Sequence, residues 1–273
     1  MADLRPLPEY ANPPVSEVVL SVEFLPLEGW KGSHGGRFWA EIVQEYPQTE
    51  VQPMLPSQIE QFGEDVWKQR PVQVEFGDPD WARFWFIGEP PTRLIQVQRN
   101  RFIVNWRKIQ GDEVYPRYVN DIRPRFQREW ERFKGYVAAQ QLGAVSVQQC
   151  EVTYINDIPQ GQGWTTPADT ARLFAPWSGK VTEGFLSSPE MLNIAGSFLM
   201  PEDQGRLHFI IQRAFRKTDE SQILQLRLTA RGRPRSGDTA GVLAWMDLGR
   251  EWIVRGFTDL TTAEAHRLWR RIR

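Results

Sequence analysis

The chain has 273 residues, of which 41% are hydrophobic and 25% are charged, and its formal net charge is −1. This composition excludes a disordered chain, and the length suffices for one large domain or two small ones. No apolar run approaches the ~20 residues of a membrane span, and the first residues lack the apolar core of a signal peptide. The single cysteine, Cys150, excludes an intramolecular disulfide and a cysteine-based zinc site. We therefore expect a cytoplasmic protein that does not associate with membranes.

The first predicted elements are a strand, a helix and a second strand. Residues 15–25 alternate apolar and polar side chains, which is typical of a half-buried strand. Residues 35–47 carry apolar side chains every four positions and predict a short helix. Residues 51–71 contain three prolines and are interpreted as a connection. The aromatic-rich residues 81–88 predict a short strand.

A β-hairpin follows. Residues 93–98 and 101–106 both alternate, and Arg99-Asn100 between them is a plausible two-residue turn because asparagine tolerates positive φ. In the second strand, one face is apolar and the other is mostly polar. The apolar face holds Phe102, Val104 and Trp106, and the opposite face holds Arg101, Ile103, Asn105 and Arg107. Strand alternation therefore aligns the basic side chains.

A long helix closes the first half of the chain. Apolar residues at spacings of three and four predict a helix over residues 116–141. Pro124 lies inside this stripe and predicts a kink, or a break with a restart. Residues 145–157 then return as a strand.

The second half repeats the order of sheet and then helix. Residues 158–180 are rich in Gly, Pro and Thr and are interpreted as the link between the halves. Strands are predicted at residues 191–200, 206–216 and 223–231. Residues 241–257 show a helical apolar face, and Thr261-x-x-Glu264 predicts a capping box that restarts the helix.

These elements predict an α+β fold. We expect antiparallel sheets packed by the long central helix and a C-terminal helical pair, in two similar sheet-then-helix halves, because regularly alternating βαβ units are absent. The expected domains are residues 1–157 and 158–273, with one continuous domain as the alternative.

Four stretches carry a resemblance to a known family: "NPPVSEVVLSVEF", "RNRFIVNWRK…YPRY", "CEVTYIND" and "REWIVRGFTDLTTAEAHRLW". In this order and spacing, they resemble the sporadically distributed family of uncharacterised prokaryotic proteins with an N-terminal Pro-Pro-strand signature. The resemblance implies no established activity, ligand or catalytic residue. Patchy occurrence across distant microbes implies mobile genetic cargo, such as defence or toxin–antitoxin genes.

Catalytic and metal-binding motifs are missing from the sequence. No phosphate-binding loop, dinucleotide fingerprint, nucleophile elbow or zinc-protease motif is present. His34, His208 and His266 have no second histidine or cysteine at ligand spacing, so structural or surface roles are favoured. Cys150 is interpreted as a buried, inert thiol. We expect no metal, no cofactor and no catalytic residue, and the sequence leans away from an enzyme.

Charge and tryptophan content favour a binding function. Residues 1–98 hold 7 Lys/Arg against 15 Asp/Glu, whereas residues 99–273 hold 26 against 19, and 12 tryptophans are many for this length. Arginine and tryptophan concentrate at protein interfaces. The candidate surface comprises Arg99, Arg101, Trp106, Arg107, Arg227, Arg231, Arg233 and Arg235.

The sequence therefore predicts a non-enzymatic interaction protein whose partner is another protein or a second copy of this chain. One alternative is nucleic-acid binding through the arginine-rich C-terminal half, with Trp106 and Arg107 as a stacking platform. A second alternative is a small ligand in a cavity between helix and sheet.

Overall fold

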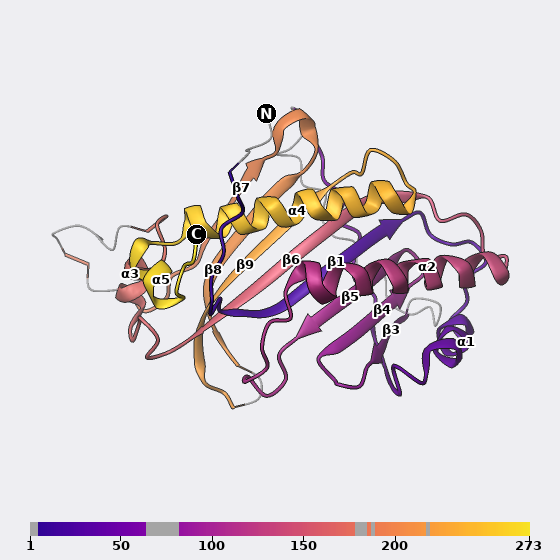
Figure 1. Cartoon of the computed structure of the whole chain (residues 1–273), viewed down its shortest axis with the longest axis horizontal. Helices are drawn as coiled ribbons and strands as arrows, with labels where there is room; N and C mark the ends of the chain where they lie inside the picture. Colours follow the sequence, from indigo (N-terminus) through magenta and orange to yellow (C-terminus); the bar gives the residue numbers. More distant parts are fainter. Residues whose placement is uncertain (1–4, 64–81, 178–184, 187–188, 217–218) are drawn as a thin grey trace.

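The computed structural model describes residues 5–63, 82–177, 185–186, 189–216 and 219–273. Within these ranges, one antiparallel sheet of nine strands forms the body of the protein, in the order β2-β3-β4-β5-β1-β6-β9-β8-β7 (Figure 1). The strands are β1 (Val15–Phe24), β2 (Gln48–Pro53), β3 (Ala82–Ile87), β4 (Arg93–Gln98), β5 (Arg101–Arg107), β6 (Val147–Pro159), β7 (Ile194–Leu199), β8 (Arg206–Phe215) and β9 (Gln222–Gly232). The predicted α+β class and antiparallel pairing are confirmed.

Two long helices, α2 (Arg123–Ala139) and α4 (Thr239–Leu260), lie side by side on one face of the sheet (Figure 1). α4 crosses β6, β8 and β9, and α2 crosses β5. The shorter helices are α1 (Ser33–Ile42), α3 (Thr170–Leu173) and α5 (Ala263–Leu268). The long helices and the sheet face beneath them supply the bulk of the hydrophobic core.

In this core, the apolar side chains on one face of the strands pack against the apolar side chains of α2. Phe102 of β5 stacks on Phe133 of α2 with ring centres 4.9 Å apart, and Phe24 of β1 lies against Trp130 and Phe133. All four rings are at most 1% exposed. Buried aromatic rings contribute large apolar areas and additional edge and stacking contacts, so these residues anchor the helix layer to the centre of the sheet.

The boundary predicted between residues 157 and 158 falls inside β6. This strand pairs with β1 on one side and with β9 on the other, so one sheet runs across that position. Segments distant in sequence therefore form adjacent strands at the centre of the sheet.

Two helix boundaries refine the sequence-based expectations. α2 begins at Arg123 with Pro124 in its first turn, after one wide π-type turn at Tyr118–Ile122. The sequence predicted a kink, or a break with a restart, at Pro124. The backbone instead stays helical through Ile122 and Arg123 and changes from π-type to α-type hydrogen bonding there, which places the proline in a first turn. The capping box predicted at Thr261 was wrong: Thr262 caps α5 by accepting a hydrogen bond from the amide of Ala265. None of the helices in the described ranges has the length and apolarity that crossing a bilayer requires.

Candidate binding groove on the open sheet face

The face of the sheet opposite α2 and α4, here called the open face, carries mostly polar side chains. Alternation places every second strand residue on this side, and cross-strand pairing arranges these residues in rows. One row runs across β5, β1, β6 and β9 and consists of Arg107, Glu17, Ile155 and Arg227. The sequence of the strands therefore encodes a charged surface on one side and the core on the other.

Part of this surface is neutralised by ion pairs. Arg101 pairs with Glu23, and Arg231 pairs with Glu151. Each ion pair joins neighbouring strands, so these arginines stabilise the sheet. With 7% of its surface exposed, Arg101 is a structural residue and not a free ligand contact.

Residues 54–62 run along one end of the open face. The amide of Leu55 donates to Gln98 of β4, Ser57 donates to Glu23 of β1, and the amide of Glu60 donates to Gln149 of β6. These bonds tie the segment to three strands. The open face is thereby bounded at the end where β4 meets β5.

Glu60 anchors the far end of this segment to β8. Its carboxylate contacts both Arg206 and His208. Burial alone raises the pKa of Glu60, but the hydrogen bond from His208 and the charges of His208 and Arg206 outweigh it, so the pKa lies below its ordinary value. Glu60 is therefore charged at neutral pH and fixes the segment by charge-assisted bonds.

A groove crosses the open face. It consists of two depressions of about 570 and 620 Å³ that share Gln96 and Ile155 in their walls. Arg83 and Arg227 line the first depression, and Arg107 lines the second with Trp85. The volumes match the range of ligand-binding clefts, ~300–1,000 Å³.

Three arginines of the groove have no carboxylate within ion-pair distance among the described residues: Arg83, Arg107 and Arg227. The guanidinium carbons of Arg83 and Arg107 lie 5.5 and 5.3 Å from the centre of the Trp85 ring. The Nε atoms of these two arginines and the Nε1 atom of Trp85 are buried and have no hydrogen-bond partner in the described chain. The groove therefore presents an excess of donors and positive charge.

A chain of side-chain hydrogen bonds crosses four strands beneath this cluster. Arg83 donates to Gln96 (2.8 Å), Gln96 donates to Asn105 (2.7 Å), and Asn105 donates to Glu17. Burial raises the pKa of Glu17, although the bond from Asn105 and the charges of Arg107 and Arg227 act in the opposite direction. The single carboxylate at the end of this chain is thus held in a site that disfavours its charge.

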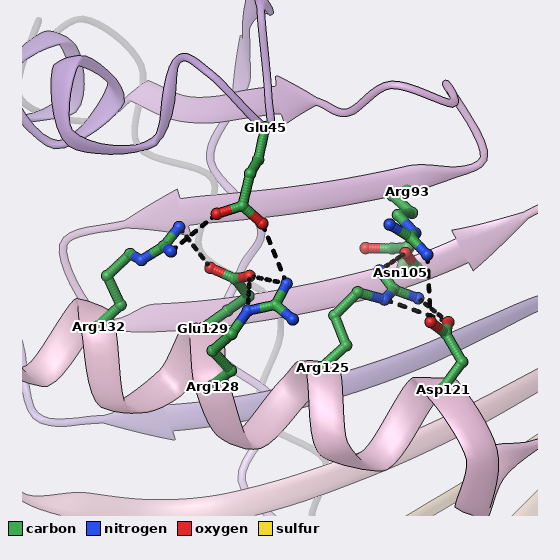
Figure 2. Close-up of polar contacts among 8 residues, drawn as sticks. All are labelled: Glu45, Arg93, Asn105, Asp121, Arg125, Arg128, Glu129 and Arg132. Atoms are coloured by element: carbon green, nitrogen blue, oxygen red, sulfur yellow. Dashed lines mark hydrogen bonds and ion pairs between the residues drawn. The ribbon is translucent and has the colours of Figure 1, made fainter.

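Asn105 is also held from the helix side of the sheet. The main-chain carbonyl of Asn105 accepts a hydrogen bond of 3.0 Å from the side chain of Arg125 of α2, which is only 2% exposed (Figure 2). Arg125 in turn contacts Asp121 at 3.3 Å. The backbone of β5 is therefore fixed beneath the groove, which limits the movement of the side chains above it.

A separate cluster of ion pairs lies further along α2. The fully buried carboxylate of Glu129 contacts Arg128 at 2.6 Å and Arg132 at 3.3 Å, and both arginines also reach Glu45 (Figure 2). A buried charge requires such partners. We assign this cluster to the packing of α2 against the segment after α1.

The structure brings together four of the eight residues predicted as a binding surface. Arg101, Arg107, Arg227 and Arg231 line the groove. The other four lie elsewhere: Arg99 in the β4–β5 turn, Arg233 and Arg235 in the exposed loop after β9, and Trp106 on the helix side.

The assignment of Trp106 as a stacking platform was wrong. Trp106 is 4% exposed and packs against Tyr115 in the core, with ring centres 5.7 Å apart. Trp85 provides the aromatic surface of the groove instead. The alternation of "ARFWFI" in β3 indicates that Trp85 faces the groove, since Arg83 and Trp85 share a face opposite Phe84 and Phe86.

The three histidines and the cysteine all lie in the described ranges. In the described part of the chain, no group of three or more His, Cys, Asp or Glu residues is placed to hold a metal ion. Cys150 is fully buried in β6, and burial raises the pKa of its thiol. His266 is within 2.9 Å of the Thr261 hydroxyl, a structural contact at the start of α5.

Comparison with known proteins adds no assignment: no protein-family model, curated protein or solved structure matches the chain.

Proposed function

We propose that this protein is a non-enzymatic binding protein whose groove on the open face takes an acidic, extended segment of a partner protein. The observation that carries the proposal is a set of three groove arginines, Arg83, Arg107 and Arg227, that form no ion pair among the described residues. Two of them, Arg83 and Arg107, lie beside Trp85. Unpaired guanidinium groups in a groove favour carboxylate ligands, because their planar fork matches a carboxylate.

A protein ligand is favoured over nucleic acid by the charges between these arginines. The groove also contains the carboxylates of Glu17, Glu151 and Asp157, which repel a continuous phosphate backbone. An acidic peptide places its charges at intervals and offers backbone amides to the side chain of Gln225 in the second depression. Tryptophan and arginine are also the residues that most often anchor protein interfaces.

We further propose that the chain is built from two similar sheet-then-helix halves, and that the groove spans their junction. β5 returns to pair with β1 before α2, and β9 returns to pair with β6 before α4. Arg107 comes from the first half and Arg227 from the second. Membership of the sporadic prokaryotic family, and a role in a mobile defence or toxin–antitoxin system, remain part of this proposal and rest on the resemblance of the four sequence stretches.

The test measures the binding of four ligands. These are a peptide rich in aspartate and glutamate, the same peptide with every aspartate replaced by asparagine and every glutamate by glutamine, single-stranded DNA and duplex DNA. The groove variant combines Arg107→Gln with Arg227→Gln, and the matched control combines Arg233→Gln with Arg235→Gln in the exposed loop. We expect the acidic peptide alone to bind, with at least tenfold weaker binding to the groove variant and unchanged binding to the control.

Two results contradict the proposal. Equal binding of the acidic and the amide peptide would show that the negative charges of the peptide do not contribute to its binding. Tight DNA binding that weakens steeply between about 50 and 200 mM salt, and that is lost in the loop variant, assigns the function to nucleic acid and to the loop after β9.

A further inference from the structure

A second cavity lies on the helix side of the sheet, away from the groove. The chain before β1 passes across α4 on its way into the sheet (Figure 1). Between this segment, the C-terminal half of α4, β6 and residues 115–120 lies a cavity of about 270 Å³. An apolar cavity of about 150 Å³ is large enough to bind benzene, so this one has room for a larger organic molecule.

Most of the wall is apolar. The sheet contributes Leu228, α4 contributes Ile253, Val254 and Phe257, and the chain before β1 contributes Leu7 and Pro13. Arg117 holds the outer wall in place, because its guanidinium donates to the carbonyls of Tyr10 at 3.0 Å and Ala11 at 3.4 Å. Its φ of 70° is unfavourable for a residue with a side chain, so tertiary contacts maintain this conformation.

One cation of the wall, Arg250, forms neither a hydrogen bond nor an ion pair with the described residues. The guanidinium of Arg250 lies 5.0 Å from the centre of the Tyr118 ring, and its Nε atom is buried without a hydrogen-bond partner. The nearest acidic residues on α4 are engaged elsewhere, Asp247 by Arg123 and Glu251 by Arg255. Arg250 is thus available to an acceptor inside the cavity.

A hydroxyl hydrogen of the wall is also unused. Tyr154 is 5% exposed and its hydroxyl lies 3.0 Å from that of Tyr115. One hydrogen satisfies this contact, and the second hydroxyl hydrogen of the pair has no acceptor within hydrogen-bond distance in the described chain. A buried donor without an acceptor is costly. The same site therefore offers a positive charge and a neutral donor.

We propose that this cavity binds a small organic acid, with the carboxylate between Arg250 and the Tyr115–Tyr154 hydroxyl pair and an apolar body against α4. A single guanidinium balances one negative charge. A phosphate ester brings close to two charges at pH 7, whereas the other arginines of the wall are engaged, Arg117 by backbone carbonyls and Arg273 by Glu9. This ligand site is independent of the peptide-binding groove.

The test measures binding of octanoate, octanol and octylamine to the full chain by calorimetry and by the shift in thermal unfolding. We expect saturable binding of octanoate, weaker binding of octanol and no binding of octylamine. Arg250→Gln is expected to weaken octanoate binding about tenfold and to leave octanol binding unchanged. The matched control, Arg267→Gln on the exposed side of α5, is expected to bind octanoate as the parent does.

A second variant locates the ligand without changing charge. Val254→Trp fills the cavity from α4 and is expected to abolish binding of both octanoate and octanol, while circular dichroism verifies that the variant is folded. Octanoate binding that persists in folded Val254→Trp overturns the assignment of the cavity. Equal affinities for octanoate and octanol, or no saturable binding of either by the parent, overturn the proposed acid site.

Discussion

The guanidinium of Arg107 on β5 lies 5.3 Å from the centre of the Trp85 ring on β3, so the two side chains meet above the intervening strand β4. This contact fixes an arginine that forms no ion pair among the described residues. A cation on an aromatic face contributes about 0.5–2 kcal/mol, depending on exposure.

Trp85→Leu is expected to weaken binding of the acidic peptide and to lower the free energy of unfolding by about 1–2 kcal/mol. The reason is that Arg83 and Arg107 both lose their aromatic support. Trp85→Phe keeps a ring and is the matched control, with a smaller effect on both quantities. Urea unfolding and peptide titration check these values. Unchanged affinity in Trp85→Leu would show that the ring does not orient the arginines.

Glu17→Gln is expected to bind the acidic peptide more tightly, since the substitution removes the carboxylate between Arg107 and Arg227 and retains an acceptor for Asn105. The exposed residue Glu50 of β2 provides the control Glu50→Gln, with unchanged affinity expected. Weaker binding of Glu17→Gln would instead indicate that the ligand contacts Glu17 through a donor.

The pH dependence of this variant follows from the raised pKa of Glu17. A carboxyl whose pKa is higher in the folded state contributes stability that is present below its ordinary value and is lost as pH rises through the folded-state pKa. Glu17→Gln therefore gains stability relative to the parent at neutral pH, and the difference shrinks toward pH 4. Urea unfolding at several pH values measures this difference, and a gain that grows toward acid contradicts the assignment.

Glu129→Gln is expected to lower the free energy of unfolding by about 3 kcal/mol, because removing one partner of a buried ion pair leaves uncompensated charge. The variant leaves Arg128 and Arg132 with the exposed Glu45 as their remaining partner. Glu131→Gln, at an exposed position of the same helix, is the control and should change stability by less than about 0.5 kcal/mol. Similar stabilities of the two variants would show that Glu129 is dispensable for packing α2.

Cys150 is expected to react with a thiol reagent only after unfolding, because burial raises its pKa and removes the sulfur from solvent. The labelling rate in increasing urea should follow the fraction of unfolded protein measured by circular dichroism. Rapid labelling of the native protein would place Cys150 in a part of β6 that opens locally.

Local sequence patterns predicted much of this architecture. The alternation over residues 101–107 correctly separated Phe102 from Arg101, since a strand has a fixed period of two. The same rule was available for residues 82–87, yet the groove went unrecognised because its residues come from strands distant in sequence. No local pattern indicates that Glu17 lies opposite Arg107. Nor does one indicate that Arg101 of the predicted surface forms an ion pair with Glu23.

The sequence suggested a cavity between helix and sheet as an alternative, but the residues that line it could not be predicted for a related reason. Its residues lie in the chain before β1, in residues 115–120 and in α4, which only the folded chain brings together. Arg250 is predicted as a helical residue, but its lack of an acidic partner depends on Asp247 binding Arg123. Such competition between side chains is a property of the packed structure.

The position of β1 between β5 and β6 also determines the order in which the protein can assemble during synthesis. Leu20 pairs with Val104 on one side and with Val152 on the other. The first pairing is available once β5 has emerged from the ribosome, whereas the second waits for β6, and until then β1 presents an unpaired edge. Unpaired edges recruit other strands, and distant pairings form slowly. During synthesis the chain therefore exposes an edge of β1 until β6 follows, and then an edge of β6 until β9 follows, and chaperone binding at these two stages would protect it.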